Sequence, residues 1–311
     1  MKNLKLKANQ GTGEVSLIYH PEYYDYNAGS GVWQMNAYNT VLLSLNQNEY
    51  NIVMPEKATV GDANFAHTPE YVNKVFSKPD TRNNPGWSGN WDEKSQAAVL
   101  RSTGGMIKAN EEALKNGHAI QLYDAFHHAY PDHGEGFCVL NDVAIAALKY
   151  ANAGYKVMII DTDVHQGQGT AVCTANNKNI YTISLHEEDN YPHKKEKSSI
   201  DWGFGNNITD DQYLIILKEC INVGINDFGD PDLVMYIAGT DLYENDKLSH
   251  TNITMDGIKE RDKYVYSFFG VLGIPVSTSI PQGYAKDIND SIMMIHNTIQ
   301  EAKNAKEKYY K

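Results

Sequence analysis

The stretch VMIIDTDVHQGQGT, residues 157–170, decides the fold class. Its first four residues are apolar at consecutive positions, which is typical of a parallel strand that helices cover on both faces. Asp161, Asp163 and His165 then follow at alternate positions. If the strand geometry persists beyond the apolar run, side chains two residues apart project from the same face. We therefore expect Asp163 and His165 to converge on one point.

The same alternation of apolar runs and amphipathic segments extends outward from this stretch. From residue 118 onward it predicts repeated βα units, and therefore a single three-layer αβα domain over residues 1–311 with a mainly parallel central sheet. The segment at 77–94, rich in Pro, Gly, Asn and Trp, is expected to be a long loop at the rim of a site. The expected strands are SLIYH (16–20), HAIQLYDAF (118–126), NIYTISLH (179–186), LVMYI (233–237) and PVSTSI (275–280). The expected helices are WQMNAYNTVLL (33–43), VAIAALKYANAG (143–154), 209–227, one with alternating charge after residue 256 and a last one ending in KNAKEKYYK.

Composition narrows the class of protein. The chain has 311 residues, of which 41% are hydrophobic, so it can bury a substantial core. A net charge of −12 argues against direct binding of nucleic acid and of an anionic membrane, and is compatible with cationic substrates. Three scattered cysteines favour a reducing compartment. We expect a cytoplasmic protein without a membrane span, because neither a signal peptide nor a long apolar run is found.

A third ligand-type residue follows another strand. The run LVMYI leads into AGTDLYEND, which places Asp241 at the carboxyl end of that strand, where open α/β sheets build their sites. One histidine and two carboxylates can hold zinc and leave a coordination position open for water. The alternative is that these aspartates cap the helices that follow them.

Two adjacent histidines, His127 and His128, stand between an apolar stretch and a glycine-containing turn. Two charged imidazoles side by side repel each other, so the pair indicates proton chemistry or metal binding. The alternative is a pair of partly buried, hydrogen-bonded side chains with a structural role.

With these residues in view, the chain resembles the zinc-dependent histone deacetylases and their bacterial relatives, within the arginase/deacetylase fold. The likeness covers most of the chain, from HTPEYV at residue 67 to GYAKD around Tyr284. The stretches RSTGGMIKA, WGFGNNITDDQYL and GIKERDKYV are most similar to the class IV branch. The shared motifs, in family order, are FHHA, GEGFCVLND, DTDVHQGQGT, TISLH, NYPHKKEKSSID, YIAGTDLYENDKL and QGY.

The resemblance implies a role for each site residue. Zinc would be held by Asp163, His165 and Asp241. His128 would be the general base, His127 its electrostatic partner held by Asp161, and Tyr284 the donor to the oxyanion. The remaining implied residues are Gly136 and Phe137 on one wall of an acyl-lysine tunnel with Leu248 opposite, and Asp161, Asp163, His165, Ser184 and Leu185 around a potassium ion.

Three departures from the family pattern stand out. Pro281 and Gln282 precede Gly283 and Tyr284 where relatives have a run of glycines, which makes the backbone there stiffer. Ser249 and His250 follow Leu248 where relatives have glycine. Gln168 occupies a position where many relatives carry Asp or Asn directed at the second histidine. We expect activity to survive with an altered pH dependence.

Three other functions can be compared with this reading of the sequence. A binuclear manganese amidinohydrolase would need acids at the positions of Gly167 and Tyr243, so a second metal has too few ligands. A binding module that grips acyl-lysine without cutting it is disfavoured by the complete metal and histidine set. The expected substrate is acyl-lysine in a protein or peptide, with acetyl or longer fatty acyl groups. The alternative is an acylated polyamine or another small amide.

Overall fold

The computed structural model describes residues 14–25, 31–77 and 91–310, with one sheet at its centre. In these residues eight strands pair in the order β2-β1-β3-β8-β7-β4-β5-β6, and every pairing is parallel. The strands are β1 (Ser16–Ile18), β2 (Asn51–Val53), β3 (His118–Gln121), β4 (Val157–Asp161), β5 (Ile180–Glu187), β6 (Ile200–Phe204), β7 (Leu233–Ile237) and β8 (Val276–Ser279). Because the strands are parallel, their carboxyl ends share one edge of the sheet.

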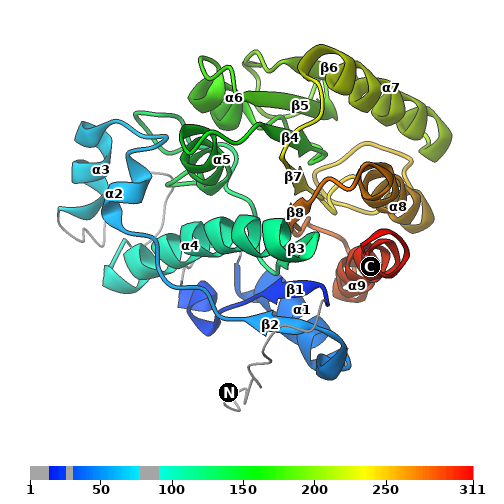
Figure 1. Cartoon of the computed structure of the whole chain (residues 1–311), viewed down its shortest axis with the longest axis horizontal. Coiled ribbons are helices and arrows are strands. Elements are labelled where there is room, and N and C mark those ends of the chain that lie inside the picture. Colours follow the sequence, from blue (N-terminus) through cyan, green and yellow to red (C-terminus); the bar gives the residue numbers. More distant parts are fainter. Residues whose placement is uncertain (1–13, 26–30, 78–90, 311) are drawn as a thin grey trace.

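Helices cover both faces of this sheet, so the predicted three-layer α/β fold is confirmed. Figure 1 shows α4 and α5 on one side and α7, α8 and α9 on the other. The α-helices are α1 (Gly31–Ser44), α2 (Val60–Ala63), α3 (Pro69–Phe76), α4 (Glu93–Asn116), α5 (Asp142–Asn152), α6 (Gln168–Thr174), α7 (Asp210–Phe228), α8 (Met255–Leu272) and α9 (Ile288–Tyr309), and the 3₁₀ helices are η1 (Pro21–Asp25) and η2 (Gln47–Glu49).

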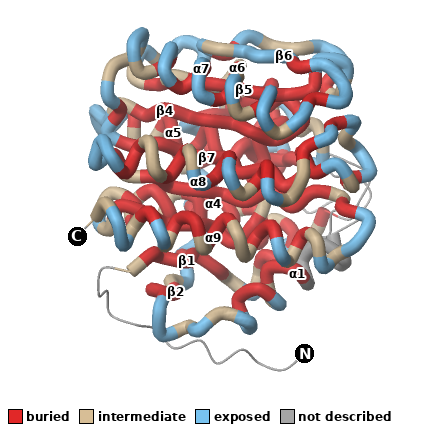
Figure 2. Tube along the Cα trace, turned by 90° about the vertical axis from the view of Figure 1, so that its right-hand side faces the viewer, coloured by how far each residue is buried: buried red, intermediate tan, exposed pale blue. Residues whose placement is uncertain are grey.

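The central strands explain why their sequences are apolar at consecutive positions. Every residue of β4 and of β7 is buried, and Figure 2 shows this buried band through the middle of the molecule. Both faces of these strands lie under helices, so polar residues cannot alternate with apolar ones. Tyr236 in β7 illustrates the exception, because its buried hydroxyl donates to Asp262 of α8 at 2.5 Å.

The N-terminal third contains elements that the sequence pattern did not reveal. The predicted strand at SLIYH is β1, and the predicted helix at 33–43 lies within α1. The short elements β2, α2 and α3 were not expected. Most of the expected loop at 77–94 falls on residues 78–90, outside the described residues. Among the helices that the structure describes, none has the length and apolar character needed to cross a bilayer.

Candidate active site

Three ligand-type side chains meet at the carboxyl edge of the sheet. Strands β4 and β7 are neighbours, so the segment after β4 and the segment after β7 emerge side by side. Asp163, His165 and Asp241 are buried there, and one ligand atom of each lies within 4.8 Å of the others. Nδ1 of His165 is 3.1 Å from Oδ1 of Asp163 and 3.0 Å from Oδ2 of Asp241.

The expected convergence of Asp163 and His165 is found, but its expected cause is wrong. Strand β4 ends at Asp161, so strand geometry does not continue to His165. A turn brings the two together instead, because the backbone N–H of His165 donates to Oδ1 of Asp163 at 2.9 Å. Gly239 allows the close approach of the second segment, since a Cβ there would lie 2.7 Å from Cα of Asp163.

The alternative role as helix caps does not apply to these aspartates. Helix α6, the first after Asp163, begins at Gln168 with Gly167 as its N-cap. Helix α8, the first after Asp241, begins at Met255, and its cap is the side chain of Thr254. Both carboxylates therefore face the site, where Oδ1 of Asp241 accepts the backbone N–H of Val164 at 3.0 Å.

The electrostatics of the cluster favour a cation. Burial raises the pKa of Asp241 well above its usual range, and the neighbouring carboxylate of Asp163 raises it further. Burial alone would lower the pKa of His165, but hydrogen bonds to the same two carboxylates raise that pKa to about 10. Positive charge is thus stabilised between the carboxylates. A divalent metal ion bound by one imidazole and two carboxylates satisfies the same requirement, so the residues fit a metal.

The two histidines lie beside this cluster and have different partners. Nδ1 of His127 is 2.8 Å from Oδ2 of Asp161, and Nδ1 of His128 is 2.7 Å from Oε1 of Gln168. Their Nε2 atoms are 3.1 Å apart. The predicted contacts of Asp161 with His127 and of Gln168 with His128 are therefore present.

The surroundings of the two histidines shift their pKa values in opposite directions. Burial opposes the charge of His127, but the carboxylates of Asp161 and Asp163 raise its pKa to about 9. Burial lowers the pKa of His128 well below its usual value, and the nearby charges of His127 and His165 lower it further. One imidazole is thus suited to carry a proton and its neighbour to accept one.

The predicted tunnel residues are only partly brought together. A Cβ at Gly136 would lie 2.6 Å from Cδ2 of His128, so this turn lies directly against that ring. Phe137 is exposed and has a φ of 65°, a left-handed conformation rare for an aromatic residue. Leu248 is exposed too, and its carbonyl accepts a hydrogen bond from Asn190 at 2.7 Å. A tunnel wall formed by Leu248 opposite Phe137 stays a prediction.

The segment that carries Tyr284 is held against the group of Asp163, His165 and Asp241, called the metal-type cluster below. A Cβ at Gly283 would lie 2.7 Å from Cα of Asp241, so a side chain there has no room. Gly283 donates its N–H to Oγ1 of Thr240 at 2.8 Å, and the backbone N–H of Tyr284 donates to Asp246. Pro281, which stands where relatives have glycine, takes part in the same contact, because its carbonyl accepts the N–H of Thr240 at 3.0 Å. Tyr284 thus follows a segment that backbone hydrogen bonds hold beside Asp241.

The residues expected around potassium come from adjacent strands. Asp161 at the end of β4 is paired in register with Ser184 of β5, and Leu185 follows it. Oγ of Ser184 is 3.0 Å from Nδ1 of His186. Register therefore brings Asp161 and Ser184 together, whereas the potassium site stays a prediction.

Sequence reasoning missed three residues of this site. Tyr191 places its ring 5.1 Å from that of His128, centroid to centroid, and its hydroxyl donates to Glu135 at 2.9 Å. Buried Asp246 accepts the N–H of Leu248 at 2.8 Å as well as that of Tyr284, so it joins the two loops. Each lies within a quoted motif, but nothing in the sequence indicates which loop it contacts.

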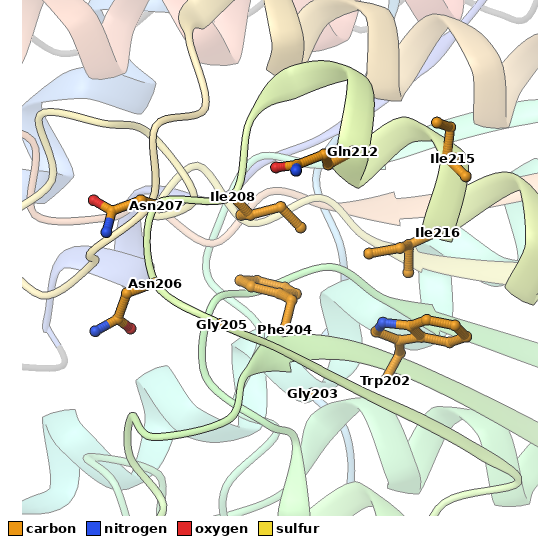
Figure 3. A pocket seen from close by; sticks show the side chains of 10 residues that line it. All are labelled: Trp202, Gly203, Phe204, Gly205, Asn206, Asn207, Ile208, Gln212, Ile215 and Ile216. Atoms are coloured by element: carbon orange, nitrogen blue, oxygen red, sulfur yellow. The ribbon is translucent and has the colours of Figure 1, made fainter.

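A separate hollow of about 600 Å³ lies between β6 and the start of α7. Figure 3 shows Trp202, Phe204, Ile208 and Ile216 around it. None of the predicted site residues lines this hollow. The chemistry is therefore located by the buried aspartate and histidine cluster and not by the hollow.

Comparison with known proteins identifies related chains. A family model described as the histone deacetylase domain matches residues 34–299. An uncharacterised protein of Picosynechococcus sp. is 34% identical over 250 residues, covering 78% of this chain and 81% of that protein. Histone deacetylase 2 of Arabidopsis thaliana is 31% identical over 262 residues, covering 78% of this chain and 67% of that protein.

A solved structure has the same fold. The crystal structure of a histone deacetylase homologue complexed with SAHA superposes with a TM-score of 0.76 at 18% sequence identity. The match covers 95% of this chain and 89% of that one. It therefore supports the arrangement of the sheet and its helices along almost the whole chain.

Proposed function

Because the chain belongs to the histone deacetylase family, we propose that it hydrolyses acyl-lysine amides with one bound zinc ion. The observation that carries this proposal is the buried group of Asp163, His165 and Asp241 beside a histidine pair whose Nε2 atoms are 3.1 Å apart. In the described part of the chain this is the single group of three metal-type ligands so close together, which favours one metal ion over two.

Each residue has a chemical task in this proposal. Zinc held by the three ligands would polarise the amide carbonyl and the attacking water. His128, which is neutral because its pKa is lowered, takes the proton of that water at Nε2. His127, held by Asp161, supplies positive charge next to the developing negative charge. Tyr284 donates a hydrogen bond to the oxyanion. Potassium near Asp161 and Ser184 belongs to the same proposal.

A panel of substrates tests the function. We expect the zinc-loaded protein to hydrolyse acyl-lysine peptides and, given the class IV resemblance, to remove longer fatty acyl groups faster than acetyl. Exposed Phe137 and Leu248 support this order, because they offer apolar surface to a longer chain. Values of kcat/KM are measured for peptides of increasing acyl length beside acetylpolyamines. Hydrolysis of the polyamines alone would contradict the proposed substrate, and a steady fall from acetyl onward would reverse the expected order.

The partner of His128 predicts a pH effect. Gln168→Glu places a carboxylate at the position of the amide oxygen, 2.7 Å from Nδ1 of His128. Negative charge there favours the imidazolium and raises the pKa of His128. A general base works only when unprotonated, so the acidic limb of the kcat/KM profile should move to higher pH. An acidic limb that stays in place, or moves to lower pH, would show that His128 is not the base governing it.

A further inference from the structure

Glu135 belongs to a tight turn that packs against the ring of His128. Glu135 and Cys138 exchange backbone hydrogen bonds of 2.8 and 3.0 Å. The two residues between them, Gly136 and Phe137, both have positive φ, of 54° and 65°. Such a turn holds its flanking residues in fixed positions. The backbone of Glu135 is therefore anchored next to His128.

The carboxylate of Glu135 contacts Tyr191 on a second loop and Gln168, the residue that is hydrogen-bonded to His128. Its Oε1 accepts the hydroxyl proton of Tyr191 at 2.9 Å. Nε2 of Gln168 lies 3.4 Å from the same Oε1 and 3.4 Å from the Tyr191 hydroxyl oxygen. The carboxylate can only accept, and the tyrosine proton is already donated to it. Both atoms beside this end of the Gln168 amide are therefore acceptors.

This arrangement selects one orientation of the Gln168 amide. With Nε2 toward the two acceptors, Oε1 faces Nδ1 of His128 at 2.7 Å. The reversed amide would place its oxygen against the two acceptors and its NH₂ group against Nδ1. The chosen orientation requires His128 to carry its proton on Nδ1, which leaves the lone pair on Nε2. The reversed orientation would favour the opposite tautomer, with Nε2 protonated and unable to act as a base. Because Nε2 of His127 lies 3.1 Å from that atom, this tautomer also requires His127 to give up its own Nε2 proton.

We propose that Glu135 is a positioning residue that, together with the Tyr191 hydroxyl, fixes the amide of Gln168 and through it the tautomer of His128. A carboxylate at position 168 would present an acceptor to His128 in either orientation, whereas an amide needs an external group to orient it. Glu135 is this external group, because its carboxylate accepts from the NH₂ group of Gln168. The kinetic consequence rests on the proposed function, but the tautomer does not.

Ring ¹⁵N NMR tests the tautomer without any substrate. The zinc-loaded protein is labelled at histidine nitrogens, and the His128 signals are those missing from a His128→Asn variant. We expect a protonated Nδ1 in the parent and a mixed or reversed tautomer in Glu135→Gln, because the new amide can donate as well as accept. An unchanged tautomer in Glu135→Gln would overturn the proposal, even if the protein hydrolyses none of the peptides.

A double-mutant cycle tests the kinetic consequence. On the alkaline plateau of the pH profile, Glu135→Gln should lower kcat/KM roughly 10- to 100-fold in the parent, mainly through kcat. In a Gln168→Glu background the same change should lower kcat/KM by less than about twofold, or raise it, because residue 168 no longer needs orienting. Equal losses in both backgrounds would indicate a general disturbance of the turn and would overturn the proposal.

A matched control removes one negative charge near the site and leaves the hydrogen bonds among Glu135, Tyr191 and Gln168 in place. Asp189 is exposed and lies two residues before Tyr191, so Asp189→Asn removes one negative charge from the same rim. We expect it to leave the His128 tautomer and kcat/KM unchanged. A loss in Asp189→Asn equal to that in Glu135→Gln would assign the effect to net charge and overturn the orienting role.

Discussion

Asp241→Asn is expected to abolish stoichiometric zinc binding and nearly all hydrolysis of acyl-lysine peptides. The variant keeps an oxygen for the backbone N–H of Val164, a hydrogen bond of 3.0 Å, so the local fold should persist. It loses the negative charge that faces His165 across 3.0 Å. Metal polarisation contributes several kcal/mol of transition-state stabilisation, so the rate should fall by roughly 10³-fold or more.

The metal assignment has a readout that needs no substrate. Zinc binding to the native state should raise the melting temperature of the parent, and this rise should disappear in Asp241→Asn. Elemental analysis should give one zinc per parent chain. Two tightly bound divalent ions, or none after reloading, would contradict the site.

Glu244→Gln is the control for this variant. Glu244 is exposed and lies in the same segment as Asp241, three residues later. The substitution removes the same charge from the neighbourhood of the site without removing a ligand. Zinc content, its effect on melting and kcat/KM should all remain those of the parent. A similar loss in both variants would assign the effect to the overall charge of the segment.

Tyr284→Phe should keep the metal and the fold but lose turnover by roughly 10²- to 10³-fold. The backbone of Tyr284 is held independently of its hydroxyl, since its N–H donates to Asp246 and its carbonyl accepts from Lys247 at 3.3 Å. The substitution therefore removes only the hydroxyl. A donor to the oxyanion acts in the transition state, so kcat should fall much more than KM changes.

The control for Tyr284→Phe is Tyr243→Phe, which removes a hydroxyl from the loop after Asp241. The Tyr243 hydroxyl accepts a hydrogen bond from Asn245 at 3.3 Å and has no part in the proposed chemistry. Its loss should leave kcat close to that of the parent. Turnover of Tyr284→Phe within about threefold of the parent corresponds to less than roughly 0.7 kcal/mol and would exclude the oxyanion role.

The central strands were predictable because the signal for them is local. The runs VMII and LVMYI are buried on both faces in β4 and β7, as their consecutive apolar residues predicted. The N-terminal third was harder to interpret, because β2 has only three residues and α2 only four. Elements this short carry too few residues to display a period, so tertiary packing determines them.

In the site, too, residue identities could be predicted from the sequence, whereas the contacts that orient the side chains could not. Asp163 and His165 are two residues apart, and a turn within that short segment brings them together. The interpretation from continued strand geometry reached the right pair for the wrong reason, because β4 ends at Asp161. Spacing along the chain identified the candidate ligands, whereas the backbone hydrogen bonds that orient them became visible only in the fold.

The sequence by itself determined the fold class, the family and the residues of the metal-type cluster, because apolar runs, residue spacing and motif order are local properties of the chain. The tertiary structure alone decided that β7 lies beside β4, which places Asp241 next to Asp163. It also decided that Glu135 meets Tyr191 across two loops. Such contacts depend on how helices and strands pack around one core, and no local pattern of residues encodes that packing.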